Sequence, residues 1–128
     1  MIFPVEVMDY VSQLDKLWDE VIASHQFKED KRQNKLQMNE QLEQLTTVIS
    51  IYIEISKKLS MIATPNFLKQ EHSMFTMAFE QFIQSTQDLL NSNNVENFLN
   101  GIEHRKLANE KAFDAILNIS RKIEKLLV

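Results

Sequence analysis

Three histidines are the side chains best suited to bind a metal or carry a phosphoryl group. They are His25, His72 and His104, and the chain has no cysteine to complement them. A di-iron site in a helical bundle uses glutamate and histidine three residues apart, because that spacing points both ligands at one metal. The residues three positions before these histidines are Ile22, Lys69 and Gly101. We therefore expect no metal centre, no cofactor and no catalytic set of this kind.

His104 is the candidate phosphoacceptor. Histidine phosphotransfer domains are four-helix bundles of similar length, in which lysine and glycine follow an exposed reactive histidine at three and four residues. Here His104 points to solvent on a helical wheel, but Leu107 and Ala108 stand at those two positions. A surface histidine without a special role is the alternative interpretation.

Polar residues interrupt two apolar stripes. Glu71 lies on one stripe and is a candidate buried polar or ligand-binding position; the alternative is that it reaches solvent and favours a helix N-terminus. Arg105 and Asn109 interrupt the other stripe. Antiparallel pairing places Arg105 level with about residue 81, roughly 15 Å along the axis from Glu71, so we do not expect them to share a site.

Met77 and Leu107 form the candidate interaction patch. Both fall on outward helix faces, and the same pairing places them at nearly the same height. Two adjacent exposed apolar side chains can start a dimer or a partner contact, although scattered ones are common on protein surfaces.

Composition narrows the function classes. The 128 residues carry a formal net charge of −4, which disfavours binding to nucleic acid because phosphates require lysine and arginine. The single glycine excludes a glycine-rich phosphate loop. We see no signal peptide or membrane span, and the lack of cysteine suits a reducing cytoplasm.

Apolar residues recur at helical spacing along four stretches, at about 4–27, 33–63, 65–91 and 95–127. Short connections force neighbouring helices to run antiparallel, so the chain should form one domain, 1–128, an all-α up-down-up-down four-helix bundle. We expect Thr64 to cap the third helix, Pro65 to start it, and the run Asn91–Asn94 to cap the fourth. In the first helix the expected core stripe is Phe3, Val7, Val11, Leu14, Trp18, Val21 and Ile22.

One segment permits a second interpretation. Isoleucines alternate with other residues from Ile49 to Ile55, as in a half-buried strand. However, polar residues from Glu40 to Lys57 follow steps of three and four, a solvent stripe that a strand does not produce. We therefore predict a helix here.

The second half of the chain also offers a resemblance. Its residues are Pro65, His72, Phe75, Ala78-Phe79, Phe82, Gly101, Ala108-Asn109 and Ala115-Ile116. This pattern resembles small, mostly uncharacterised helical-bundle proteins of Gram-positive bacteria, and residues 89–112 are faintly similar to flagellar-type export chaperones. Several of the bundle proteins are lipoproteins anchored through a cysteine; because this chain has none, the resemblance implies a cytoplasmic form.

These observations favour a non-enzymatic cytoplasmic module that acts as an adaptor, chaperone or regulator. Its partner would be another protein or a second copy in a homodimer, with no nucleic acid and no membrane. The alternative is a phosphotransfer bundle that uses His104, or a small-ligand-binding bundle that uses Glu71.

Overall fold

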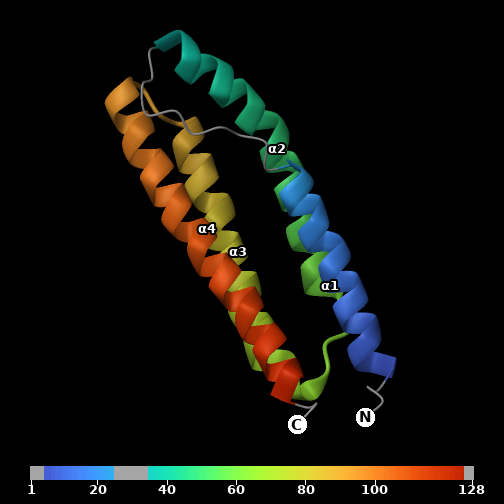
Figure 1. Cartoon of the computed structure of the whole chain (residues 1–128). Coiled ribbons are helices and arrows are strands. Elements are labelled where there is room, and N and C mark those ends of the chain that lie inside the picture. Colours follow the sequence, from blue (N-terminus) through green and yellow to red (C-terminus); the bar gives the residue numbers. More distant parts are fainter. Residues whose placement is uncertain (1–4, 25–34, 126–128) are drawn as a thin grey trace.

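The computed structural model describes residues 5–24 and 35–125 and contains four long α-helices (Figure 1). They are α1 (Val5–Ser24), α2 (Lys35–Met61), α3 (Lys69–Leu90) and α4 (Val95–Glu124), with a short 3-10 helix, η1 (Asn66–Leu68), before α3. Successive helices run in opposite directions, which confirms the all-α four-helix bundle. The segment Ile49–Ile55 lies inside α2, and the described residues contain no strand.

The buried positions follow a seven-residue repeat. On α1 they are Val7, Tyr10, Leu14, Leu17 and Val21. On η1 and α3 they are Leu68, His72, Phe75, Phe79, Phe82, Thr86 and Leu89, with Ile83 beside them. Steps that alternate between three and four keep one row of each helix against its neighbours over many turns. Two positions of this buried row on α3 hold polar residues, His72 and Thr86.

This repeat corrects the core stripe predicted for the first helix. Tyr10 and Leu17 are buried, at 0% and 7% exposure, although the prediction omitted them. Val11 and Trp18 are only half-buried, and Ile22 is exposed. The prediction used 3.6 residues per turn, and a stripe of that period drifts about 20° per heptad from the row that faces the bundle. It therefore included Val11 and Trp18 in place of the adjacent Tyr10 and Leu17. Phe3 lies outside the described residues.

The start of α3 also differs from the prediction. Pro65 precedes η1, and α3 begins only at Lys69. The Thr64 hydroxyl donates back to the Ile62 carbonyl at 3.2 Å rather than capping the next helix. At the start of α4 the prediction is confirmed, because the Asn94 side chain accepts a 2.8 Å hydrogen bond from the Asn97 amide.

α3 and α4 make the most extensive helix pair. Small residues recur every seven positions along both helices, at Ala78 and Ser85 on α3 and at Gly101, Ala108 and Ala115 on α4. All five are half-buried. Small side chains between two helices allow the backbones to approach closely, which explains why this pair is the tight one.

Three contacts define the register of this pair. Glu71 bonds to Lys122, Thr86 bonds to Arg105, and Leu89 lies against Gly101. For any two residues at equal height, the number of the α3 residue and the number of the α4 residue therefore add up to between 190 and 193. Arg105 is level with Thr86 rather than with residue 81, and its axial distance from Glu71 is about 22 Å.

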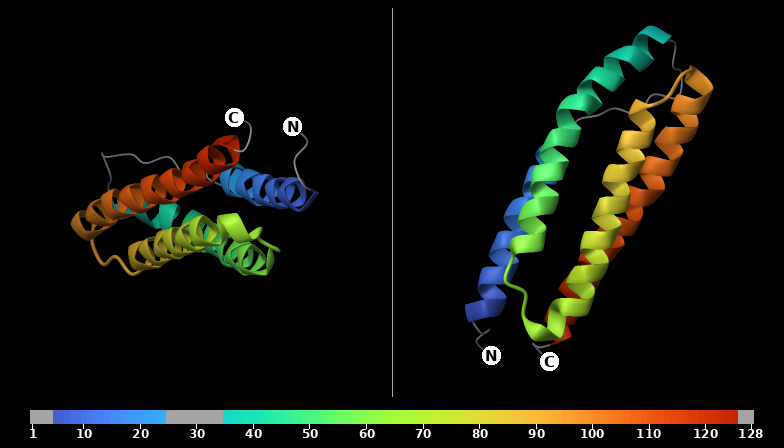
Figure 2. Two further views of the ribbon diagram at one scale, coloured as in Figure 1. Left: turned by 90° about the horizontal axis from the view of Figure 1, so that it is seen from below. Right: turned by 180° about the vertical axis from the view of Figure 1, so that it is seen from behind.

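α1 covers only part of the bundle. It runs beside the C-terminal half of α2, and the N-terminal part of α2 extends beyond it (Figure 2). The core divides accordingly. The larger cluster takes residues from all four helices, whereas the cluster at the other end contains only α2, α3 and α4 residues: Met38, Leu45, Leu89, Phe98 and Ile102.

Candidate interaction surface on the outer face of α3 and α4

A buried arginine holds α3 and α4 in register. Arg105 is 1% exposed, and its Nε donates to the Thr86 hydroxyl at 3.1 Å. One of its terminal nitrogens donates to the Tyr52 hydroxyl at 3.2 Å, and its guanidinium carbon lies 4.8 Å from the centre of the Phe82 ring. A buried cation is tolerated only when hydrogen bonds replace its water. The prediction that Arg105 lies on the core face is confirmed, and its hydrogen bonds link α4 to α3 and α2.

A second polar layer joins α1, α2 and α3. His72 lies between the Tyr10 hydroxyl, 2.8 Å from Nδ1, and the Leu59 carbonyl oxygen, 3.0 Å from Nε2. A carbonyl only accepts, so Nε2 carries a proton; in the neutral ring Nδ1 then accepts from the Tyr10 hydroxyl. Burial raises the pKa of the Tyr10 hydroxyl well above its ordinary value, and the Glu71 charge raises it further. This histidine is occupied by packing and hydrogen bonding.

Glu71 forms an ion pair at one end of the α3–α4 seam. Both carboxylate oxygens accept from the Lys122 Nζ, at 2.9 and 3.0 Å. The Glu71 side chain is 18% exposed and that of Lys122 is 40% exposed. The hydrogen bond from Lys122 lowers the pKa of the Glu71 carboxyl. The carboxylate proposed as a ligand position therefore has an internal partner from α4, which the sequence reading did not identify.

The outward face of the same helix pair has an unusual composition. We define the α3–α4 outer face by eleven exposed residues: Gln70, Met74, Met77, Gln81, Gln84, Asp88, Asn91, Asn97, Asn100, His104 and Leu107. On each helix they follow steps of three and four. Asp88 is the single acidic or basic residue in the set if the histidine is neutral. Further along α4 the same row continues with Lys111 and Asp114, where the uncharged region ends.

α1 provides a contrast, counted over all of its exposed residues and not along one face, while on α3 and α4 the rows beside the outer face carry the charges: Lys69, Glu80, Glu96, Glu103, Lys106 and Glu110. α1 also has eleven exposed described residues, and five of them are charged: Glu6, Asp9, Asp15, Lys16 and Asp19. Solvent-facing helix rows are normally rich in charge. The central parts of protein interfaces are depleted in charged residues and enriched in methionine. The α3–α4 outer face therefore has an interface composition, whereas the exposed side of α1 does not.

One end of this face is hollowed. A groove of about 520 Å³ lies between the C-terminal half of α3 and the N-terminal half of α4. Its lining residues are Gln81, Gln84, Ser85, Asp88, Asn91, Ser92, Asn97, Asn100, Gly101 and His104. Gly101 allows a close contact here, because an added Cβ would lie 2.6 Å from the buried Leu89 Cδ1 and that side chain would have to move. Five of the lining side chains are carboxamides, which both donate and accept hydrogen bonds.

Met77 and Leu107 border this groove along the same helix rows, one step beyond Gln81 and His104 respectively. They are 59% and 57% exposed. The register places Leu107 level with about residue 84, so the two side chains are about seven residues, or roughly 10 Å, apart in height. The expectation that they lie at nearly the same height is therefore wrong. The prediction paired the two helices symmetrically about the loop that connects them, and that pairing differs from the observed register by about five residues.

The remaining chemistry-bearing residues are dispersed. His104 is exposed in the groove, His72 is buried in its hydrogen-bonded layer, Asn109 is half-buried, and His25 lies outside the described residues. Among residues 5–24 and 35–125 no group of three histidines or carboxylates is placed to hold a metal ion. In the same part of the chain no helix is both long and apolar enough to cross a membrane.

Two other grooves are more ordinary. The groove between α1 and α2, of about 430 Å³, is bordered by Lys16, Glu20 and Lys58, and the last two approach within 3.9 Å. The groove between α2 and α3, of about 390 Å³, is rich in hydroxyl groups. Two of those hydroxyls, on Ser60 and Thr76, already donate to backbone carbonyls of their own helices.

The low charge of the outer face was detectable in the sequence, by counting charges along the row from Gln70 to Asn91 rather than apolar residues alone. The Glu71–Lys122 pair was not, because it depends on the register of α3 against α4.

Comparisons of the chain with protein-family models, with curated proteins and with solved structures gave no match in any of the three. The resemblance to Gram-positive bundle proteins therefore stays a prediction. The geometry of the chain itself carries the functional argument that follows.

Proposed function

We propose that the chain is a non-enzymatic protein-interaction module, acting in the cytoplasm, that binds a protein through the α3–α4 outer face. The observation that carries this proposal is the distribution of charge on α3 and α4: the eleven residues of the outer face include one charged residue, Asp88, whereas the rows beside it carry the charges of the same helices. Covering an uncharged surface costs less hydration energy than covering a charged one, and the carboxamides of this face can replace their water by hydrogen bonds to a partner.

The contacts between α3 and α4 support the same proposal. The Arg105–Thr86 bond, the close Gly101–Leu89 contact and the Glu71–Lys122 pair lie along one seam, directly beneath the outer face. A surface held on a rigid pair of helices loses less conformational entropy on binding than one on loops.

The chemistry of the groove distinguishes this proposal from phosphotransfer. Among the residues that line it, none is lysine or arginine, and Asp88 places a negative charge in the same groove as His104. Phosphoryl groups are normally bound by cations and backbone amides, and a nearby carboxylate repels them. The groove favours neutral hydrogen-bonding groups.

The experiment is site-specific photo-cross-linking in the native host. A photoreactive amino acid replaces Met77 in one variant and Met8 in the control, because the two methionines are 59% and 56% exposed and lie on different faces. We expect a discrete protein adduct from position 77, identified by peptide mass spectrometry, and none from position 8. Adducts from neither position, or the same adducts from both, would contradict the proposal.

A further inference from the structure

The groove at one end of the α3–α4 outer face contains a single formal charge if His104 is neutral. Asp88 lines this groove, and none of the other lining residues is a lysine, an arginine or a carboxylate. One Asp88 carboxylate oxygen accepts a hydrogen bond from the Gln84 amide nitrogen at 3.0 Å, and the ion pairs of the described residues do not include Asp88. An ionised carboxylate has about four acceptor sites, so Asp88 can also accept from a cation.

The end of α3 adds to this negative charge. Asp88 lies in the last turn of α3, and that turn contains no basic residue. The C-terminus of a helix carries a partial negative charge, whereas the N-terminus of α4 carries a positive one, which Glu96 in its first turn balances. Lys106 and Lys111 are exposed on α4 but do not line the groove. With a net charge of −4 on the whole chain, the groove attracts a basic side chain.

Neutral hydrogen-bonding groups make up most of the remaining lining. Five of them are carboxamides: Gln81, Gln84, Asn91, Asn97 and Asn100. A carboxamide both donates and accepts, and each residue of a polypeptide main chain also presents one donor and one acceptor. In an extended segment the main-chain groups are unbonded and follow one another at about 3.3 Å per residue. The lining is therefore chemically complementary to an extended main chain.

A partner helix fits this groove less well. The main-chain groups of a helix are already bonded within the helix, so it would offer the carboxamides only its side chains. A helix that binds in a groove also buries an apolar face there. The lining contains no apolar side chain, because it consists of carboxamides, serines, Asp88, His104 and Gly101.

We infer that this groove binds an extended segment of another protein, with a lysine or arginine side chain bonded to Asp88 and the main chain bonded to the carboxamides. The inference specifies the partner of the α3–α4 outer face and rests on the function proposed above. From Gln81 to Asn91 the groove is about 15 Å long, which four or five extended residues would occupy.

An apolar side chain of the segment has a defined place as well. Leu107 borders the groove, is 57% exposed, and is level with about residue 84 of α3. Its height therefore differs from that of Asp88 by about four residues, or roughly 6 Å. Alternate residues of an extended chain lie about 6.6 Å apart and point to the same side. The segment should thus carry an apolar residue two positions from its basic residue.

Titration of the full chain with synthetic peptides tests the inference, followed by the NMR signals of the side-chain carboxamides. The probe is acetyl-Ser-Leu-Thr-Lys-Thr-Leu-Ser-amide, in which a leucine lies two positions from the lysine on either side, so that both chain directions are covered. We expect a dissociation constant of about 0.1–1 mM. The signals of Gln81, Gln84, Asn97 and Asn100 should shift, and that of Gln13, exposed on α1, should not.

Two altered peptides test how the segment is bound. Acetyl-Ser-Thr-Leu-Lys-Leu-Thr-Ser-amide has the same composition, but its leucines point to the opposite side from the lysine, so it should bind at least about threefold more weakly. N-methylation of both threonines of the first peptide removes two main-chain donors and keeps every side chain, and should weaken binding at least about fivefold. Equal binding of the methylated peptide would contradict recognition of the main chain.

Exchange of charge tests the role of Asp88. Asp88→Asn should weaken binding of the lysine peptide at least about fivefold, and Asp88→Lys should prefer the peptide with glutamate in place of lysine. Asp15→Lys, at an exposed position on α1, is the matched control and should leave both dissociation constants unchanged. Circular dichroism should show the same helix content in all variants.

Three results would overturn the inference: no binding of the lysine peptide up to about 5 mM, equal binding of the lysine and glutamate peptides by the parent chain, or equal effects of Asp88→Lys and Asp15→Lys. A protein cross-linked from position 77 would in that case leave the proposed function standing and remove only the extended basic segment.

Discussion

The Nε atom of Arg105 donates a 3.1 Å hydrogen bond to the hydroxyl of Thr86, a residue 19 positions earlier in the chain. Both side chains are buried, at 1% and 0% exposure. This bond connects α3 to α4 at one height, and the guanidinium extends onward to the Tyr52 hydroxyl on α2. One buried cation thus links three helices, and a shift of one turn would break both bonds.

Replacing the hydroxyl in this bond should destabilise the fold. Thr86→Val keeps the shape of the side chain but removes the acceptor for the Arg105 Nε, at an expected cost of about 1–3 kcal/mol in the free energy of unfolding. The control is Thr76→Val on the same helix, whose hydroxyl donates only to the Ser73 carbonyl. It should change stability by less than about 0.5 kcal/mol. Urea denaturation measures both, and equal effects would show that the Arg105–Thr86 bond is unimportant.

Gly101→Ala should destabilise the chain although alanine favours helix. The helical gain is about 1 kcal/mol. The new methyl group would meet Leu89 Cδ1 at 2.6 Å, and Leu89 is fully buried, so overpacking of about 1–3 kcal/mol exceeds that gain. In a Leu89→Val background the obstructing atom is absent, and Gly101→Ala should become stabilising by about 0.5–1 kcal/mol. Denaturation of the four chains tests this reversal; the same sign in both backgrounds would refute the close contact.

The buried Tyr10 hydroxyl predicts a loss of stability in alkali. Its pKa is raised in the folded chain by burial and by Glu71, so above pH 10 the unfolded chain releases the tyrosine proton while the folded chain retains it. Stability should therefore be unaffected by this group at lower pH and should fall as pH rises beyond 10, by up to about 1.4 kcal/mol per pH unit. Tyr10→Phe should remove this contribution to the slope. Denaturation at pH 9 to 11 compares the two chains, and identical slopes would contradict the assignment.

Glu71 predicts a dependence on the acid side. Its folded pKa is lowered by Lys122, so its contribution is present above the ordinary carboxyl pKa and is lost as pH falls through the lower folded value. Glu71→Gln should remove this part of the acid sensitivity, and Lys122→Met should reduce it. Thermal melts from pH 3 to 7 would show the difference as a smaller decrease in Tm.

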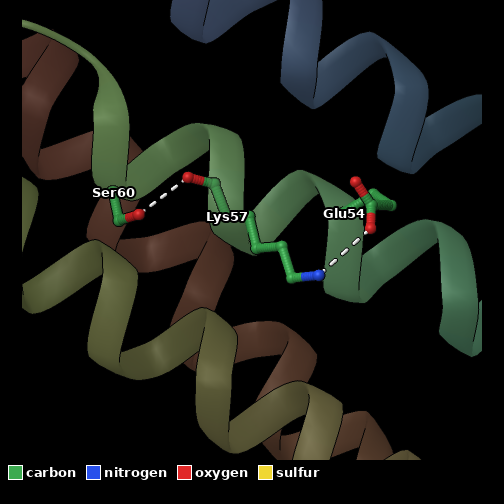
Figure 3. A network of polar contacts seen from close by, with 3 residues as sticks. All are labelled: Glu54, Lys57 and Ser60. Carbon is green, nitrogen blue, oxygen red and sulfur yellow. Dashed lines mark hydrogen bonds and ion pairs between the residues drawn. The ribbon is translucent and has the colours of Figure 1, made fainter.

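A pair on the surface of α2 supplies the control for Glu71. Glu54 and Lys57 approach within 3.3 Å, but their side chains are 64% and 67% exposed (Figure 3). Exposed pairs of this kind contribute little, because water and salt screen them. Glu54→Gln should leave the melting curves nearly unchanged, and a loss of acid sensitivity equal to that of Glu71→Gln would contradict the distinction between the two sites.

The fold was predictable because apolar periodicity and short connections determine a four-helix bundle almost independently of detail. The segment Ile49–Ile55 shows this, since the long polar stripe around it outweighed its local β-branched alternation. The exact rows of core residues were harder to predict from the sequence. Tyr10 reads as half polar and Ile22 as apolar, yet the seven-residue repeat buries the first and exposes the second.

The candidate site was only partly predictable. Met77, Leu107 and His104 were correctly placed at the surface, because the wheel gives their direction. Their heights were not, because the register of two helices depends on how side chains interdigitate rather than on loop length. Lys122, the partner of Glu71, was missed for the same reason.

The central claim is that protein binding takes place on the α3–α4 outer face, and methionine methyl NMR tests it most directly. Within residues 5–24 and 35–125 four methionines are exposed: Met74 and Met77 on that face, and Met8 and Met61 elsewhere, at 55%, 59%, 56% and 82% exposure. With the methyl groups labelled, spectra of the chain are compared in buffer and in extract of its native host, so that any protein partner is tested. We predict that the Met74 and Met77 signals shift and broaden while those of Met8 and Met61 stay constant. A response at Met8 or Met61 instead, or no response from any of the four, would contradict the account.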